Sequence, residues 1–454
     1  MEPTGLRFGG GTAATLLHPI VAVAMALAII LILRLQRQYV IVPLLLAIFF
    51  IPKGQVLVVA GVHFTMARIL ILTGLARWTT SRRSSPLAGG FNSIDRVFAL
   101  WALSSLVVFS LQWMNSQALI KSLGEFLDAM GGYFVLRFLI HDAEDVKRVI
   151  KLFALIAIMA AVCMINEQLT GTNIFALLGG MPPMTVRDGS IRSQAAFEVF
   201  ITAGAYGATV LPLLVWLWSK SKGIAALGMI GATVMTFTCH ASTTLSAEVA
   251  GMFALCLWPL RNRMRLVRWG LVVTLVGLHL VMNGPVWSLI EKVDLTGSSS
   301  SYHRYMLIDN CIRHFGDWWL LGVKDYDKWG FDMWDLSDQY VAYAVSGGLL
   351  TLVLFVGIIS RSFARLGTAR RLAAGNREKE WLLWGLGAAL FAHVVAYFGI
   401  GYFDQMQFAW FALLAIICAA VFEAKASPNP QVEEVLPSAC QVDGPNWSVL
   451  EAIQ

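Results

Sequence analysis

The sequence predicts an all-α polytopic integral membrane protein with about 12–13 transmembrane helices. Of its 454 residues, 57% are hydrophobic and only 14% are charged. A soluble chain of this length carries more charge. Apolar runs of about 20 residues recur from end to end, and a helix of that length crosses a hydrocarbon core about 30 Å thick.

The apolar runs, and the polar breaks between them, place the expected spans along the chain. The second span, 39–52, is too short to cross unaided and could be re-entrant. The fifth, 118–140, carries charged residues and is therefore expected to face the interior of the bundle. Those charged residues are Lys121, Glu125, Asp128 and Arg137. The expected spans are 17–33, 39–52, 56–76, 95–113, 118–140, 149–169, 194–218, 222–242, 244–260, 266–284, 339–360, 380–400 and 404–422.

Lysine and arginine are concentrated in alternate short loops, and the basic side of a membrane protein is cytoplasmic. The two longest loops between spans, 170–193 and 285–338, are therefore expected on the external side. The polar tail 423–454 is expected to be disordered and cytoplasmic. The basic clusters are Arg34 and Arg37; Arg77, Arg82 and Arg83; Lys147, Arg148 and Lys151; Lys220 and Lys222; Arg261, Arg263, Arg265 and Arg268; Arg361, Arg365, Arg370 and Arg371.

Composition also excludes several classes of protein. The net charge of +6 comes from these short loops, so it does not indicate nucleic-acid binding. The six cysteines are scattered without a C-x-x-C pair, which predicts neither a disulfide framework nor a zinc site. No cleavable signal peptide is expected, because Arg34 and Arg37 follow the first apolar run where a small-residue cleavage site would stand.

The external loop 285–338 is too aromatic to be a disordered linker, and loops of this length are usually functional. Tryptophan favours the membrane interface, and its flat face also packs on sugar rings, so both interpretations stay open. The tryptophans are Trp287, Trp318, Trp319, Trp329 and Trp334.

Within this loop, residues 301–315 have the spacing of an amphipathic helix that would lie along the outer membrane surface or cap the bundle. Serines at its start are good N-caps, and Asp309 and Arg313, four residues apart, are expected to pair. The apolar face consists of Tyr305, Ile308, Ile312 and Phe315, and the opposite face of His303, Asn310 and His314.

Arg304 is expected at the edge of that apolar face, beside Ile308 and Cys311. It would point toward the lipid headgroups or into a cavity at the top of the bundle. The planar fork of donors on arginine is a usual partner of phosphate oxygens. The alternative is an arginine that only anchors an interfacial helix.

A second basic segment, "MPPMTVRDGSIRSQAAFEVFITAG", contains Arg187 and Arg192 just before the seventh span. Glu198 is expected in the first turns of that span, and an acid within a span is a functional hypothesis by default. It could equally pair with one of the two arginines. Charged residues near or inside other spans carry the same two interpretations. They are Arg68, Glu248 and Asp404.

Three segments together resemble the O-antigen ligase/polymerase superfamily, and most closely its exopolysaccharide polymerase branch. The resemblance covers roughly residues 150–430. The segments are "RDGSIRSQAAFEVFITAG", "GSSSSYHRYMLIDNCIRHFGDWWLLG" and "WDLSDQYVAYAVSGGLLTLVLF".

The resemblance implies a multi-pass glycosyltransferase of the bacterial inner membrane that works on the periplasmic face without a metal or cofactor. Its donor would be an undecaprenyl-pyrophosphate-linked oligosaccharide, and export and chain-length proteins would be possible partners. By resemblance, Arg192 and Arg304 grip the pyrophosphate, helped by Arg187. His303 would orient Arg304 or contact sugar, and Trp318 and Trp319 would contact sugar.

The implied organisation has N-terminal transmembrane helices over 1–169, a catalytic membrane region over 170–422, and the tail. Two departures from the family matter. Many members have His-Pro where this chain has Glu198-Val199, and ligases carry His-Asn where it reads Asp338-Gln339-Tyr340. The missing histidine favours a polymerase over a ligase that transfers glycan to lipid A core. It leaves Asp338 and Glu198 as candidate general bases.

Two rival functions also fit the sequence. A transporter of polysaccharide or lipid-linked sugar would use Arg68 and the charged residues of the fifth span along a pathway at mid-depth. A non-catalytic subunit of an export assembly is the other. An enzyme of the proposed kind needs its arginines to converge on an external cavity.

Overall fold

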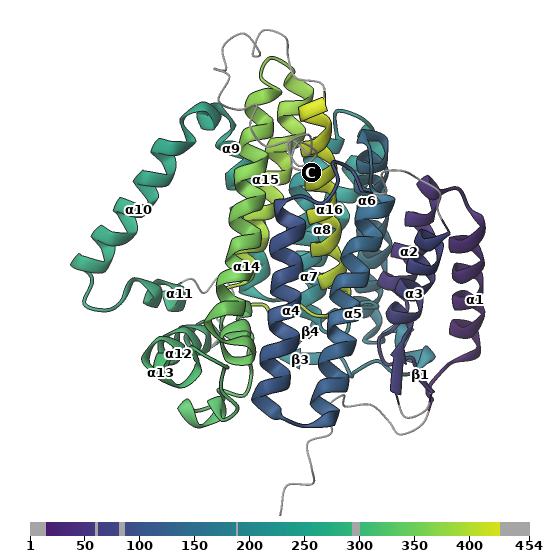
Figure 1. Ribbon diagram of the computed structural model, residues 1–454, viewed down its shortest axis with the longest axis horizontal. Helices are drawn as coiled ribbons and strands as arrows, with labels where there is room; N and C mark the ends of the chain where they lie inside the picture. The colour runs from purple at the N-terminus through teal and green to yellow at the C-terminus, as the bar shows by residue number, and fades with distance from the viewer. Residues whose placement is uncertain (1–14, 60–61, 81–86, 188, 293–299, 427–454) are drawn as a thin grey trace, which may run out of the picture.

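The computed structural model describes residues 15–59, 62–80, 87–187, 189–292 and 300–426, and Figure 1 shows them as a bundle of long helices. A helix overlaps every one of the expected spans. In the first half these are α1 (Pro19–Arg34), α2 (Arg37–Phe50), α3 (Met66–Thr79), α4 (Ser93–Trp113), α5 (Ser116–Leu139) and α6 (Ala143–Thr170). In the second half they are α7 (Phe200–Leu217), α8 (Lys222–Thr238), α9 (Ser242–Cys256), α10 (Met264–Val281), α14 (Gln339–Leu372), α15 (Arg377–Ala396) and α16 (Asp404–Ala426).

Six helices of the described chain are long and apolar enough to cross a membrane. They are α4, α6, α7, α10 with the turn before it, α14 and α16. Together with the composition, this is the architecture of an all-α membrane protein.

The helices at the centre of the bundle approach one another through small residues. In the apolar windows of α7 and α16, 83% and 89% of the residues are buried. A Cβ added to Gly207 of α7 would lie 2.3 Å from the carbonyl oxygen of Ala232 in α8. Close packing of backbones at glycine and alanine is the usual means by which transmembrane helices associate. In contrast, no residue of α10 is buried, and Figure 1 shows this helix standing away from the others.

The third expected span is only partly helical. Its first half forms an antiparallel hairpin of β1 (Val56–Val59) and β2 (Val62–Thr65), in which Val56 pairs with Thr65. The β-branched valines favour extended backbone there, and the Thr65 hydroxyl caps α3 by accepting a hydrogen bond from the Arg68 N–H. Arg68 therefore lies in the first turn of α3 and not deep in a span. It binds Asp128 of α5 at 2.6 Å.

The seventh span also begins later than expected, at Phe200, and Glu198 therefore precedes the helix. The carboxylate of Glu167 accepts hydrogen bonds from the backbone N–H groups of Gln194 and Ala195, at 2.7 and 2.8 Å. Ala195 has a left-handed backbone with φ of 52°, which prevents the helix from extending toward the N-terminus.

The fifth span only partly faces the interior. Arg137 is fully buried and binds Asp95 of α4 at 3.0 Å, as well as the carbonyl oxygens of Ala88 and Gly90. Lys121 and Glu125 instead pair with each other at the surface, where the Glu125 side chain is 60% exposed. An i,i+4 pair of this kind can stay hydrated, which explains why the prediction failed for these two residues.

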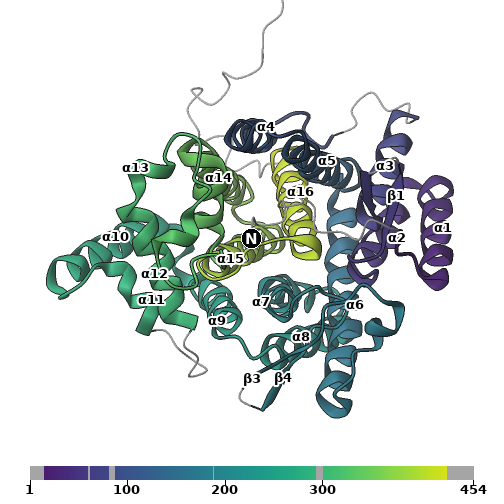
Figure 2. The same ribbon diagram turned by 90° about the horizontal axis from the view of Figure 1, so that it is seen from below.

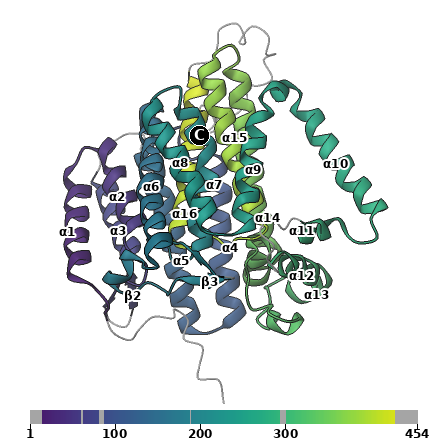
Figure 3. The ribbon, with the colours of Figure 1, turned by 180° about the vertical axis from the view of Figure 1, so that it is seen from behind.

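The bundle has two different ends (Figures 1 and 3). The hairpin end bears β1, β2, the second hairpin of β3 (Thr185–Arg187) and β4 (Ser190–Arg192), and the short helices of residues 286–329. Those short helices are α11 (Leu289–Lys292), α12 (Ser300–Arg313) and α13 (Phe315–Trp318), with single 3-10 turns at Val286–Ser288 and Tyr326–Trp329. The basic end carries the described members of the Lys/Arg clusters. Arg82 and Arg83 lie outside the described residues.

Candidate functional site

Helix α12 carries Arg304 into the protein at the hairpin end. Leu307 and Cys311 pack on Val341, Ala344 and Val345 in the first half of α14. The buried face of α12 is therefore rotated by one position from the expected one, and Ile312 and Phe315 are 47% and 45% exposed. The expectation failed because α12 packs on a helix and is not laid on lipid. As a result Arg304, only 7% exposed, is on the buried face and not at its edge.

The Arg304 side chain lies between the segment that joins α15 to α16 and the start of α9. A Cβ added to Gly399 would come within 2.4 Å of Arg304 Nε and 2.8 Å of the Thr243 hydroxyl oxygen. Glycine is thus required for the backbone to pass this close to the guanidinium. Among the described residues, the buried Thr243 hydroxyl has no hydrogen-bond partner.

Asp338 is the N-cap of α14 and is completely buried. Its Oδ1 accepts a hydrogen bond from the Val341 N–H at 2.9 Å, while Oδ2 has no hydrogen-bond partner among the described residues. Burial raises the pKa of Asp338 to about 7, although the nearby Arg304 guanidinium opposes that rise. This carboxyl group therefore changes its protonation state near neutral pH.

Arg192 reaches the same region from the second hairpin. Its guanidinium lies 4.7 Å from the ring centroid of Phe200, the first residue of α7. The backbone N–H of the next residue, Ser193, donates to the Thr238 carbonyl oxygen at 3.1 Å, which holds Arg192 close to the turn just before α9. Arg192 and Arg304 thus both lie near the start of α9. Arg187 is half-buried one strand away, on β3.

Several helices begin at this end of the bundle. The N-caps of α7 and α9, Val199 and Ala241, make no side-chain cap hydrogen bond, so the first-turn N–H groups are not satisfied in that way. The amino-terminal end of a helix carries partial positive charge and favours anions. Two arginines beside two such ends make this region suited to a polyanion such as pyrophosphate.

Glu198 belongs to a different cluster, with Lys53 and Asp404. The Lys53 ammonium lies 3.0 Å from Glu198 and 2.5 Å from Asp404. Burial alone would raise the pKa of Glu198, but the hydrogen bond with Asp404 and the charge of Lys53 lower it. Glu198 is therefore a weak base held in an ion pair. The sequence offered Arg187 or Arg192 as the partner of Glu198, but the structure pairs it with Lys53, which the sequence analysis did not single out.

The aromatic and histidine candidates differ in their surroundings. Trp318 was expected to contact sugar, but it is 4% exposed and donates its indole N–H to the Cys311 carbonyl oxygen at 2.6 Å. It therefore packs α13 onto α12. Trp319, in contrast, is 47% exposed and offers an open aromatic face. His303 lies 3.0 Å from the Asp335 carbonyl oxygen and so tethers the segment that leads to Asp338.

Thr243, Gly399 and Lys53 are the site residues that the sequence did not single out. Lys53 had a weak signal, as a lone lysine between two apolar runs on the side poor in basic residues. Within the described residues, no three His, Cys, Asp or Glu side chains gather in a way that could hold a metal ion.

Neither a protein-family model nor a curated protein matches the sequence. Function is therefore inferred from the residues and their geometry.

Proposed function

We propose that this chain is a membrane glycosyltransferase that polymerises undecaprenyl-pyrophosphate-linked repeat units into a polysaccharide. In this proposal it spans the inner membrane with about 12–13 helices and works on the periplasmic face, at the hairpin end. One observation carries the proposal, namely that Arg304 is buried between Thr243 and Gly399, beside the buried Asp338. A buried arginine can stabilise a pyrophosphate leaving group, and a nearby carboxyl group of pKa about 7 can remove the proton of the acceptor hydroxyl.

The transfer is a direct displacement. The acceptor hydroxyl oxygen attacks the anomeric carbon of the donor, and the bond from that carbon to the pyrophosphate oxygen breaks. Undecaprenyl pyrophosphate leaves with the electron pair, and the anomeric configuration inverts. Arg304 and Arg192 stabilise the negative charge that develops on the leaving group. Asp338 Oδ2 takes the proton of the acceptor hydroxyl.

Asp338 suits the role of general base better than Glu198. A base works best when its pKa is near the operating pH, and burial raises the pKa of Asp338 to about 7. The pKa of Glu198 is instead lowered by Asp404 and Lys53, against the effect of burial. Arg304 is also near Asp338, so the base and the leaving-group cation lie on the same side of the bundle.

The transporter alternative is less well supported. Its expected pathway residues are held in ion pairs, with Arg137 fully buried on Asp95 and Arg68 bound to Asp128. Arg137 also binds carbonyl oxygens of the turn before α4, at the basic end. Residues held in such contacts fix helices to one another, and they do not line a pathway through the membrane.

The decisive experiment is an assay with purified protein in proteoliposomes, lipid-linked repeat units and excess chelator. The proposal expects a ladder of lipid-linked polymers. Deletion in the native host should accumulate single repeat units, detected by mass analysis of lipid-linked glycans. Accumulated long chains would instead indicate a ligase. Uptake of the lipid-linked sugar without any new glycosidic bond would indicate a transporter.

The proposed orientation predicts which end an impermeant reagent reaches. In a background whose native cysteines are alanine, Asp325→Cys should react with an impermeant thiol reagent in intact spheroplasts, and Arg377→Cys should not. Asp325 is exposed at the hairpin end, and Arg377 is exposed at the basic end. Both sites should react once the membrane is permeabilised. The reverse labelling in intact cells would place the arginine site in the cytoplasm and overturn the proposal.

Gly399→Ala is expected to reduce polymer formation by about tenfold or more, because a small misplacement of a charge-stabilising group is costly. The new methyl group would stand 2.4 Å from Arg304 Nε, so the guanidinium must move. Gly387→Ala in α15 is the matched control, since nothing lies within 4 Å of its added Cβ. Polymer yield per folded protein is the measurement. Equal yields from both variants would mean that the position of Arg304 does not matter.

A further inference from the structure

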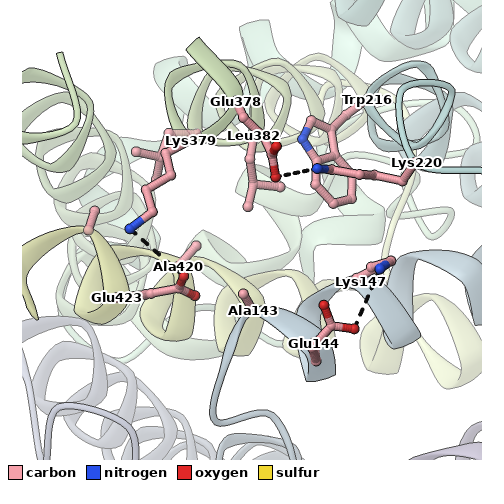
Figure 4. A pocket seen from close by; sticks show the side chains of 12 residues that line it. Ala143, Glu144, Lys147, Trp216, Lys220, Glu378, Lys379, Leu382, Ala420 and Glu423 are labelled. Carbon is pink, nitrogen blue, oxygen red and sulfur yellow. Dashed lines mark ion pairs between the residues drawn. The ribbon is translucent and has the colours of Figure 1, made fainter. Parts of the chain in front are cut away.

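A cavity at the basic end, far along the bundle from Arg304, is a candidate second site. It has a volume of about 110 Å³ and lies between α6, α7, α15 and α16. That is smaller than the roughly 300–1,000 Å³ of pockets for drug-sized ligands, so the cavity suits a single small group. Figure 4 shows three lysines around it, Lys147, Lys220 and Lys379.

Two of these lysines have glutamate partners that are much more exposed than themselves, and the third, Lys379, lies 4.0 Å from Glu423, with side chains 30% and 36% exposed. Lys147 lies 3.5 Å from Glu144, with side chains 31% and 73% exposed. Lys220 pairs with Glu378, with side chains 21% and 65% exposed. Ion pairs with an exposed carboxylate contribute little, because water solvates the carboxylate almost as well. An anion that enters the cavity can therefore bind the lysine ammonium groups while the Glu144 and Glu378 side chains rotate into solvent.

Trp216 supplies a second and independent observation. It lines the same cavity and is only 4% exposed, and its indole N–H has no acceptor among the described residues. A buried N–H donor without an acceptor is costly unless a ligand or water fills that role. The carboxylates around it are engaged by lysines, so an acceptor brought by a ligand fits the cavity best.

We propose that this cavity binds a phosphate group, which is carried either by an anionic phospholipid headgroup or by a free phosphate. Three ammonium groups would bind its oxygens, and the Trp216 N–H would donate to one of them. The surrounding lysines and arginines of the basic end attract anions to this face. The inference is independent of the proposed glycosyl transfer, because no residue is shared between the two sites.

The test is thermal unfolding of the full-length protein in phosphatidylcholine nanodiscs or mild detergent. Inorganic phosphate and dioctanoyl phosphatidylglycerol are titrated separately at constant ionic strength. We expect at least one of them to raise the unfolding midpoint in a saturable way, as a ligand bound only to the folded state does. A response to phosphatidylglycerol alone identifies a lipid headgroup, and a response to inorganic phosphate identifies a free phosphate.

The double variant Lys220→Gln/Lys379→Gln should weaken this binding by about tenfold or more, the usual loss for charge-assisted contacts. Trp216→Phe keeps most of the aromatic packing but removes the indole N–H, so it should weaken phosphate binding less than the double variant does. This single variant is the test if the double variant folds poorly. Lys328→Gln removes an exposed lysine at the hairpin end and should bind both probes as the wild type does. No midpoint shift with either probe, or equal affinity in all variants, would overturn the proposal.

Discussion

Arg304→Lys is expected to lower polymer formation by about 10²–10³-fold, the usual loss when a donor that stabilises a leaving group is removed. Lysine keeps the charge but loses the planar fork that binds two phosphate oxygens at once. Arg304 is 7% exposed and packed against Gly399 and Thr243. The backbone at position 304 therefore cannot shift to let the lysine ammonium reach the same phosphate oxygens. The measurement is the initial rate of polymer formation, normalised to folded protein.

Arg313→Lys is the matched control on the same helix, and it should be nearly silent. The Arg313 side chain is 69% exposed and binds Asp309 at 2.6 Å. Only the Arg313 side of this i,i+4 pair is exposed, since the Asp309 side chain is 8% exposed, and a lysine at position 313 can still reach the same carboxylate from solvent. Normal polymer formation by both lysine variants would leave Arg304 as an anchor of α12 without a role in binding pyrophosphate.

Local sequence was sufficient to place most helices. The apolar runs and their polar breaks located a helix at every expected span, because hydrophobic length and hydrogen bonding within one segment decide where a helix forms. The Asp309–Arg313 pair followed from spacing alone and is confirmed. The start of α3 was wrong, because the valines of 56–62 are apolar enough for a span but β-branched enough for a hairpin.

Tertiary packing decided what the sequence could not. The rotation of α12 that buries Arg304 depends on its contact with α14, which is distant in the chain. The approach of Gly399 to Arg304 likewise joins segments about one hundred residues apart, and no local pattern encodes such a contact. The Lys53 partnership of Glu198 was missed for the same reason.

Asp338→Asn should reduce polymer formation by about 10²–10⁴-fold, the usual contribution of a general base. Asparagine is also a good N-cap and can accept the hydrogen bond that the Val341 N–H donates at 2.9 Å, so α14 should keep its start. In the wild type the rate should rise with pH through about 7, as the carboxyl group loses its proton. The residual rate of the variant should lack that rise.

The same substitution should stabilise the protein at neutral pH, which separates loss of catalysis from loss of fold. Burial raises the pKa of Asp338 from 3.8 to about 7, so between these values the unfolded chain binds fewer protons than the folded one. Stability of the wild type therefore falls as pH rises from about 4 to about 7, by an amount on the order of 4 kcal/mol. Asparagine stays neutral and avoids this loss.

The unfolding midpoint of Asp338→Asn should thus exceed that of the wild type above pH 7 and approach it near pH 4. Asp317→Asn, which alters an exposed carboxylate 55% accessible beside His314, should change neither the rate nor this difference. Glu198→Gln decides between the two candidate bases. Suppose that Glu198→Gln removes the pH dependence of the rate while Asp338→Asn retains it. The proton of the acceptor hydroxyl then goes to the Glu198 cluster, and the only role of Asp338 is to cap α14.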